Sequence, residues 1–327
     1  MKISAASALA GIYIAANIPV MFHGAPGLGK SDLVRQLAAG RPLIDFRASM
    51  LDPVDLRGVP SVNDRVTVWN PPAFLPIEER DGANGILFAD ELTNANTAVQ
   101  GALLQLFLDR RLGEYVLPDS WRIVAAGNRQ SDRASANRLS TAAANRFAHI
   151  DIEADVKDWT LWASVHGIHP VIIAFVSLRT ELLHQMPTNG NPAFPTPRAW
   201  ANVSRALVQS GGLDMAYEIA AGLVGQGAAI EFSGFVRVWQ SMPRIPDIIA
   251  APSSTPVPLD PSAKFALACA LARAADVRTL DSVIVYLDRM GVEFSILAMT
   301  QAIARAPELL QTSAHVQWAI RHQTSLN

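Results

Sequence analysis

The sequence predicts an α/β fold, in which a parallel sheet is sandwiched by helices and is followed by an all-helical lid and a C-terminal helical extension. Up to about residue 155, short apolar runs alternate with segments of helical composition, which is the pattern of a parallel sheet covered on both faces. A glycine-rich octapeptide separates the first apolar run from the helix that follows it. Beyond residue 155 the apolar residues recur only at helical spacing.

Five short apolar runs are the expected strands of the sheet. They cover residues 18–23, 43–48, 85–90, 121–126 and 148–153. Before them, residues 3–22 carry no charge and are long enough to suggest a signal or membrane helix. Because this segment runs directly into the octapeptide, we interpret it as a helix over 5–16 followed by the first strand. The interpretation favours a cytoplasmic protein that does not enter a membrane.

The octapeptide reads GAPGLGKS over residues 24–31 and fits the phosphate-binding loop pattern G-x-x-x-x-G-K-[ST] at every required position. Small residues let successive backbone N–H groups turn toward a phosphate, and the following helix adds the positive end of its dipole. Lys30 is expected to reach the β- and γ-phosphates of a nucleotide, and the Ser31 hydroxyl to hold Mg²⁺. The expected nucleotide-binding residues are Gly24, Ala25, Pro26, Gly27, Leu28, Gly29, Lys30, Ser31 and Asp32.

Two acidic residues end the third predicted strand, within GILFADEL at 85–92. Ligands bind at the carboxyl ends of parallel strands, so both acids should face the phosphate loop. Asp90 is the expected Mg²⁺ partner, and Glu91 is the candidate base that polarises the attacking water. An acidic strand end that caps the next helix is the alternative interpretation.

Two further residues could serve the same site. Asn128 ends the fourth predicted strand and could orient the water or contact the γ-phosphate. A turn residue without such a role is an equally good interpretation, because Asn favours turns. Arg146 ends a predicted helix over 137–147. It could reach the nucleotide of a neighbouring subunit as an arginine finger, or be a surface residue that interacts with the helix dipole. Arg133 and Arg138 compete with it for the finger role.

The motifs GAPGLGKS, LFADEL, VAAGN, ANRF and TPR together resemble an AAA+ ATPase of the MoxR branch. The resemblance implies a P-loop AAA+ fold, with Asn128 as sensor 1, Arg146 as the arginine finger and Arg198 as sensor 2. Residues 52–76 resemble the hairpin insert of this branch. The implied domains are an AAA+ nucleotide-binding domain over 1–155, a helical lid over 156–250 that carries sensor 2, and a Pro-rich linker with C-terminal helices over 251–327.

The composition agrees with a soluble enzyme. A net charge of −2 gives no broad basic field for nucleic acid. A single cysteine, Cys269, excludes an internal disulfide and lies in an apolar helix. Trp159, Trp162, Val165 and Ile168 recur at helical spacing and are expected in the core.

The resemblance implies an ATP-hydrolysing ring, expected to be a hexamer, that uses ATP and Mg²⁺. MoxR-like proteins remodel or activate a partner protein, in some cases by inserting a metal or cofactor, and the partner is often a von Willebrand A or metallopeptidase-like protein. Three alternatives stay open at this point. They are a nucleic-acid-directed AAA+ motor, a magnesium-chelatase-like motor subunit, and a nucleotide-binding scaffold that does not hydrolyse.

Overall fold

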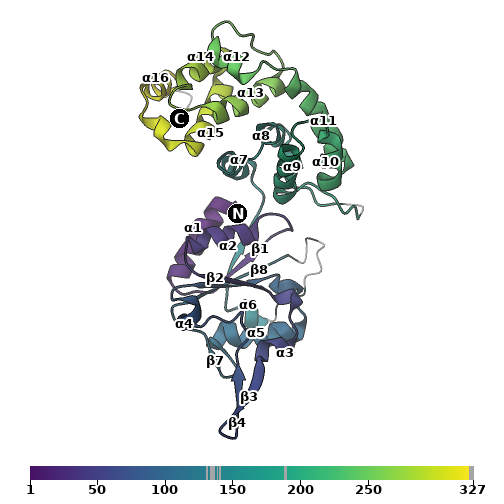
Figure 1. Cartoon of the computed structure of the whole chain (residues 1–327), viewed down its shortest axis with the longest axis vertical. Coiled ribbons are helices and arrows are strands. Elements are labelled where there is room, and N and C mark those ends of the chain that lie inside the picture. Colours follow the sequence, from purple (N-terminus) through teal and green to yellow (C-terminus); the bar gives the residue numbers. More distant parts are fainter. Residues whose placement is uncertain (130–131, 133–136, 138, 140, 188–189, 324–327) are drawn as a thin grey trace. The chain divides into compact units, whose positions relative to one another are not determined.

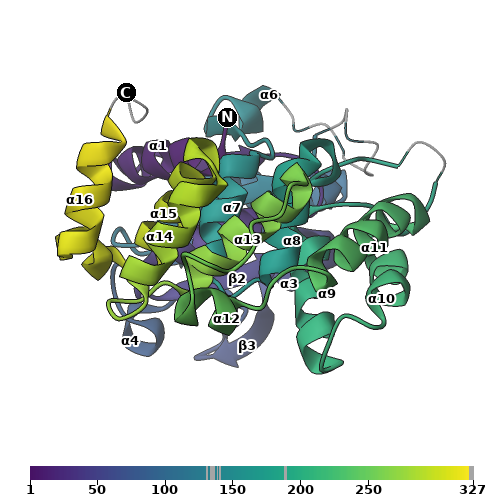
Figure 2. The ribbon, with the colours of Figure 1, turned by 90° about the horizontal axis from the view of Figure 1, so that it is seen from above.

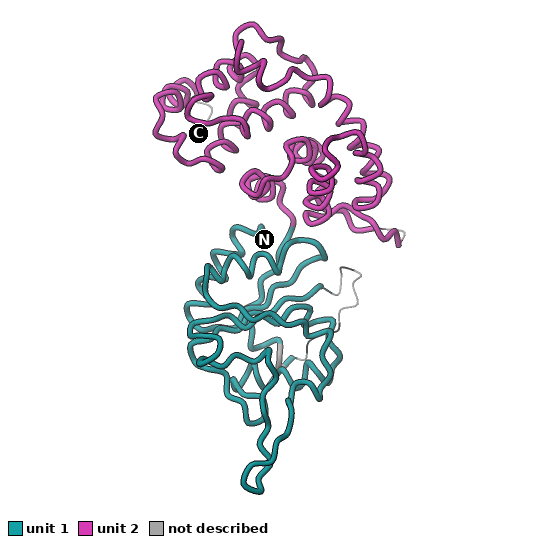
Figure 3. Tube along the Cα trace, in the orientation of Figure 1, with its two compact units in different colours: residues 1–153 teal, residues 154–327 magenta. Residues whose placement is uncertain are grey.

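A computed structural model describes the chain except for residues 130–131, 133–136, 138, 140, 188–189 and 324–327. The chain forms two compact units, residues 1–153 and residues 154–327 (Figure 3). The first contains the sheet and the second is helical.

The first unit is built on a five-stranded parallel sheet with the order β2-β5-β8-β1-β9 (Figure 1). Its strands are β1 (Val20–His23), β2 (Leu43–Arg47), β5 (Ile86–Asp90), β8 (Arg122–Gly127) and β9 (Ala148–Asp151). The central strands are almost wholly buried because helices cover both faces of the sheet. Each strand overlaps one of the predicted segments, and the predicted fold class is confirmed.

Helices of the first unit pack on this sheet or lead into it. They are α1 (Ile3–Ala15), α2 (Lys30–Ala38), α3 (Pro53–Arg57), α4 (Glu78–Asp81), α5 (Thr97–Asp109) and α6 (Thr141–Ala144), with 3₁₀ turns η1 (Ala48–Met50) and η2 (Leu92–Asn94). Helix α5 begins at an Asn96 cap, whose side chain accepts a hydrogen bond from the Val99 N–H at 2.8 Å. It buries Val99, Leu103 and Leu106 in the core beside the sheet, at the spacing of one helical face.

Two hairpins stand apart from the main sheet. Strands β3 (Val59–Asn63) and β4 (Val66–Asn70) pair antiparallel and extend from the unit (Figure 1). Asp64 and Arg65 join them, with φ of 45° and 66°, as the tight turns of hairpins require. The second and shorter hairpin is formed by β6 (Arg111–Leu112) and β7 (Tyr115–Val116).

The second unit is a set of packed helices. They are α7 (Val156–Val165), α8 (Pro170–Leu178), α9 (Pro197–Gln209), α10 (Ala216–Val224), α11 (Gln226–Gln240), α12 (Ile245–Ala250), α13 (Pro261–Ala274), α14 (Leu280–Met290), α15 (Val292–Arg305) and α16 (Ser313–Arg321), with 3₁₀ turns η4 (Thr180–Leu182) and η5 (Pro307–Gln311). In the described part of the chain, no helix combines the length and the apolar character that crossing a membrane requires.

Two hydrophobic clusters hold this unit together. In one, Phe175, Trp200 and Phe232 are in mutual contact, with ring centroids 5.3 to 5.5 Å apart. The other contains Tyr286 and Trp318 from the last helices. The lid (156–250) and the C-terminal region (251–327) remain predicted divisions of this unit.

Two predictions about helices need correction. Within the described part of 137–147, the helix covers only Thr141–Ala144, and Arg146 lies in the turn after it. Val165 ends α7 with 54% of its surface exposed, so it is not a core residue, whereas Trp159 and Ile168 are buried.

Candidate nucleotide site

The phosphate loop connects β1 to α2, as its sequence pattern requires. Gly27 and Gly29 have φ of 81° and 89°, a region that glycine adopts at little cost. A side chain at Gly24 would place its Cβ only 2.9 Å from the Ile152 carbonyl oxygen. The loop therefore depends on glycine both for its turns and for its close packing against the chain after β9.

Lys30 begins α2, and its side chain is turned into the loop. Its ammonium group donates hydrogen bonds to the carbonyl oxygens of Gly24 (2.6 Å) and Ala25 (3.0 Å) and to Oδ1 of Asn128 (3.1 Å). Only 9% of the residue is exposed, and a buried charge needs such partners. The contact joins two residues 98 positions apart, because β1 and β8 are neighbours in the sheet.

Ser31 and Asp90 form the second contact of the site. The Ser31 hydroxyl donates to Oδ2 of Asp90 at 2.7 Å, while Oδ1 of Asp90 accepts from the backbone N–H of Glu91 at 2.8 Å. A hydroxyl and a carboxylate are oxygen donors of the kind that Mg²⁺ selects. The chemistry of these two side chains therefore fits a magnesium ion, and their role as metal ligands stays a prediction.

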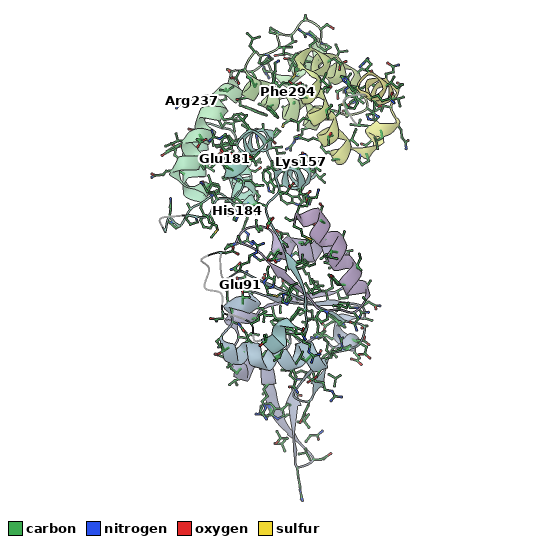
Figure 4. All side chains as sticks on the ribbon, turned by 180° about the vertical axis from the view of Figure 1, so that it is seen from behind. Glu91, Lys157, Glu181, His184, Arg237 and Phe294 are labelled. Atoms are coloured by element: carbon green, nitrogen blue, oxygen red, sulfur yellow. The ribbon has the colours of Figure 1, made fainter. Side chains whose placement is uncertain are left out.

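Glu91 follows β5 in the left-handed backbone conformation, with φ of 55°, and is labelled in Figure 4. Such a conformation is costly for a residue with a side chain and is concentrated at functional sites. The Ser49 hydroxyl donates to Oε2 of Glu91 at 2.5 Å. Ser49 was not predicted, although it follows β2, whose last residue pairs with Asp90.

Thr93 fixes the backbone of Asn128. Its hydroxyl accepts from the Asn128 N–H at 3.0 Å and donates to the Asn128 carbonyl oxygen at 3.2 Å. A Cβ on Gly127 would come within 2.5 Å of that hydroxyl oxygen, so a glycine is needed beside it. Thr93 directly follows the motif GILFADEL, and its contact with Asn128 was not predicted from the sequence.

A polar group lies behind the loop, at the ends of β1 and β9. The rings of His23 and His149 stack, with 2.8 Å between Nε2 of His23 and Nδ1 of His149. Arg129 pairs with Asp151 at 2.9 Å and donates to the Ile152 carbonyl oxygen at 2.7 Å. Burial, and secondarily the neighbouring His149, lower the pKa of His23 below its usual value. None of these four side chains was predicted from the sequence.

Three more of the predicted residues are exposed on the surface of their own unit. Asp32 is exposed on α2 and pairs with Arg35 at 2.8 Å. Arg146 is exposed in the first unit. Arg198 is exposed in the first turn of α9, in the second unit. Arg133 and Arg138, the alternative fingers, fall outside the described residues.

Comparison with known proteins gives a family match within the first unit and structural similarities that cover both units. Residues 19–147 match the family described as AAA domain (dynein-related subfamily). No curated protein is detectably similar to the chain. Among solved structures, NtrX from Brucella abortus in complex with ADP is similar, with 16% identity, a TM-score of 0.44, and coverage of 98% of this chain and 68% of that one.

The RuvB Holliday junction branch migration motor of Thermotoga maritima is also similar, with 16% identity, a TM-score of 0.36, and coverage of 98% of this chain and 86% of that one. The AAA match includes the loop 24–31, both acids, Asn128 and Arg146. Residues 19–147 are therefore similar to an AAA domain, in agreement with the α/β P-loop AAA+ fold of the first unit.

Proposed function

We propose that the chain is an ATP-hydrolysing, ring-forming AAA+ protein of the MoxR branch that remodels or activates a partner protein. One observation carries the hydrolytic part of this proposal. Two hydrogen-bonded pairs, Lys30 with Asn128 and Ser31 with Asp90, form a cluster at the carboxyl ends of β1, β5 and β8. Such an arrangement of cation, hydroxyl, carboxylate and amide can bind the phosphates of ATP with magnesium and stabilise charge there.

Each residue of the cluster receives a role in this proposal. The loop N–H groups and Lys30 bind the phosphates, so Lys30 exchanges its carbonyl partners for phosphate oxygens. Ser31 and Asp90 hold Mg²⁺, which neutralises phosphate charge when bound. Asn128, fixed by Thr93, orients the attacking water or senses the γ-phosphate.

Glu91 is the proposed base in this reaction. Its carboxylate takes a proton from the attacking water as the new bond to the γ-phosphorus forms and the bond from that phosphorus to the β–γ bridging oxygen breaks, which releases ADP. Ser49 donates to that carboxylate and is a positioning residue. The carboxylate has further lone pairs, so the Ser49 hydrogen bond can hold the side chain while another lone pair accepts the proton.

The proposal that the chains assemble into a ring rests on Arg146. Arg146 is exposed in the turn after α6 and takes no part in the hydrogen bonds described above for the site. An arginine placed in this way can stabilise the transition state of a neighbouring subunit's ATP. Arg198, on the first turn of α9, is proposed to couple the loss of phosphate to movement of the lid.

The β3–β4 hairpin is the proposed contact for the partner protein. Val59, Val62 and Val66 on it expose 63 to 80% of their surface. Such a projecting group of valines has no role in the core of its own unit and is suited to binding another protein. The same branch resemblance suggests a von Willebrand A or metallopeptidase-like partner.

Nucleotide binding and hydrolysis can be separated by two variants. Lys30→Ala should lose ATP binding, because the loop loses its only lysine. Glu91→Gln should still bind ATP but hydrolyse it about 10²- to 10⁴-fold more slowly. Equilibrium binding of ATP with and without Mg²⁺, followed by a single-turnover assay, measures both. Glu91→Gln with wild-type turnover would contradict the proposed base.

A further inference from the structure

Four helices of the second unit, α7, α8, α13 and α15, enclose a small cavity. Figure 2 shows them together, and α13 and α7 each contact both α8 and α15. The cavity measures about 10 Å³, which is enough for one water-sized group. Its polar lining consists of Ser164, Cys269, Arg273, Gln301 and Arg305.

Two buried hydrogen-bond donors at this cavity lack an oxygen or nitrogen acceptor. Gln301 is only 3% exposed, and apart from a weak hydrogen bond toward the Cys269 sulfur its amide nitrogen has no acceptor. Nε of Arg305 has no acceptor either. The Cys269 sulfur beside them is a weak acceptor at most. Buried polar groups are nearly always paired, so two unpaired donors in one cavity indicate a missing acceptor.

The charge at the cavity is also unbalanced. Arg273 and Arg305 both line it, and among the described residues no acidic side chain does. Their hydrogen bonds go to backbone carbonyl oxygens, from Arg273 to Ile168 at 2.9 Å and from Arg305 to Ala275. Burial raises the pKa of Cys269 to about 12, so the thiol remains neutral and supplies no negative charge.

Capping of helix ends explains part of this arrangement. Ala275 is the C-cap of α13, and Ile168 lies between α7 and α8. Each arginine therefore satisfies one free carbonyl. That role requires neither the Gln301 amide nor Nε of Arg305, and it leaves two positive charges at one cavity.

We propose that this cavity is a binding site for one oxyanion group, a carboxylate or a phosphoryl group. A single oxygen enters and accepts from Gln301 and Arg305, because the cavity has room for one such atom. The rest of the group lies at the mouth beside Arg273, which is exposed. A water molecule could fill the same space, but it would leave both guanidinium charges without a counter-charge.

Cys269 provides a local reporter, because it is the only cysteine of the chain. The experiment measures how fast a small uncharged thiol reagent modifies Cys269 in the intact chain. The urea concentration is kept below the unfolding transition. Phosphate or acetate is titrated against chloride at constant ionic strength. Lys30→Ala serves as the background, so that phosphate bound at the loop does not contribute.

An oxyanion at ten times its Kd should slow the modification about tenfold, because only the empty protein opens. Protection by phosphate alone identifies a phosphoryl site, and protection by acetate identifies a carboxylate site. Arg273→Gln should raise the oxyanion concentration needed by about tenfold. Arg289→Gln is the matched control, since Arg289 bonds to the Pro252 and Thr255 carbonyls of the same unit away from the cavity.

A second variant tests the charge argument without the thiol. Gln301→Glu places a carboxylate in the cavity that Arg273 and Arg305 line. If the cavity is an oxyanion site, this carboxylate supplies the missing acceptor. The variant should then unfold at a higher urea concentration than the parent and lose its response to phosphate and acetate. A lower urea midpoint for Gln301→Glu, or a modification rate indifferent to both oxyanions, would overturn the proposal in favour of a bound water only.

Discussion

At the scale of single residues, the site depends on groups that hold other groups in place. Thr93 contacts both the N–H and the carbonyl of Asn128, and Ser49 holds the Glu91 carboxylate. Asp90 uses one oxygen for Ser31 and the other for the Glu91 backbone. The acids and the amide are therefore positioned by short side chains from neighbouring turns, which restricts their motion before substrate binds.

Replacement of Thr93 by Val tests this clamp. Val has nearly the same shape as Thr but cannot accept a hydrogen bond from the Asn128 N–H. Because Thr93 is only 4% exposed, this N–H would be left unpaired in the interior. We expect a loss of about 1–3 kcal/mol in the free energy of unfolding, together with slower hydrolysis. Urea denaturation and turnover measure the two effects. Thr93→Ser, which keeps the hydroxyl, should retain most of both.

His23 makes the stability of the first unit depend on pH. Its pKa is lowered in the folded state by burial first and by His149 next, with Arg129 and Lys30 adding to the effect and Asp151 opposing it. The unfolded chain therefore binds a proton more readily than the folded protein. The associated stability is fully present above the ordinary pKa of 6.5 and is lost as the pH falls below it.

The variant His23→Gln isolates this contribution. Wild type should lose stability more steeply than the variant between about pH 7 and pH 5. The difference between the two proteins is the informative quantity, because His169 in the second unit also has a pKa lowered by burial. Equal pH slopes of the unfolding free energy would show that His23 is not the responsible group.

At the scale of elements, the sequence predicted what is local and missed what depends on pairing across the sheet. Apolar runs located all five strands, and GAPGLGKS located the loop, because both signals lie within a few consecutive residues. The order β2-β5-β8-β1-β9 is not visible in any such run. Ser49 and the His23–His149 pair were missed for this reason, since only that order places them beside Glu91 and the loop.

The prediction of a helix over 137–147 was wrong for a related reason. Its alanines favour a helix, but the described helical turns are limited to Thr141–Ala144. The chain has to enter β9 at Ala148, whose N–H bonds to the Pro19 carbonyl at 2.8 Å. Pairing with the sheet therefore ends the helix early and leaves Arg146 in an exposed turn.

The β3–β4 hairpin should be separable from the rest of its unit. We expect that replacing residues 61–68 by Asn-Gly, a two-residue hairpin turn, changes the unfolding free energy by less than about 1 kcal/mol, because an isolated two-stranded hairpin is marginally stable. Basal ATPase should stay at the wild-type level, while proteins that co-purify with the wild-type chain should be lost.

Val62→Ser with Val66→Ser is the milder control for that replacement. It keeps the hairpin and removes exposed apolar surface at two positions where Val exposes 80% and 63% of its area. Loss of the same co-purifying proteins would place their contact on the valines. Retention of those proteins by both variants would show that the hairpin is not the partner surface.

At the scale of the whole molecule, the nucleotide cluster and Arg146 are distinct features of the first unit. This unit alone contains the Lys30–Asn128 and Ser31–Asp90 pairs, so we propose that binding of ATP needs a single subunit. Hydrolysis is proposed to need a second subunit, which supplies Arg146. The activity of the protein should therefore depend on assembly, whereas its affinity for ATP should not.

The most direct test of this account is the ATPase rate per subunit across a wide range of protein concentration, for wild type, Arg146→Ala, Glu91→Gln and a mixture of the two variants. We predict that the wild-type rate rises with concentration, by the mass action of assembly, and that each variant is nearly inactive alone. The mixture should recover activity, because a neighbour that lacks Glu91 still supplies Arg146. A rate independent of concentration, with Arg146→Ala as active as wild type, would contradict the shared site.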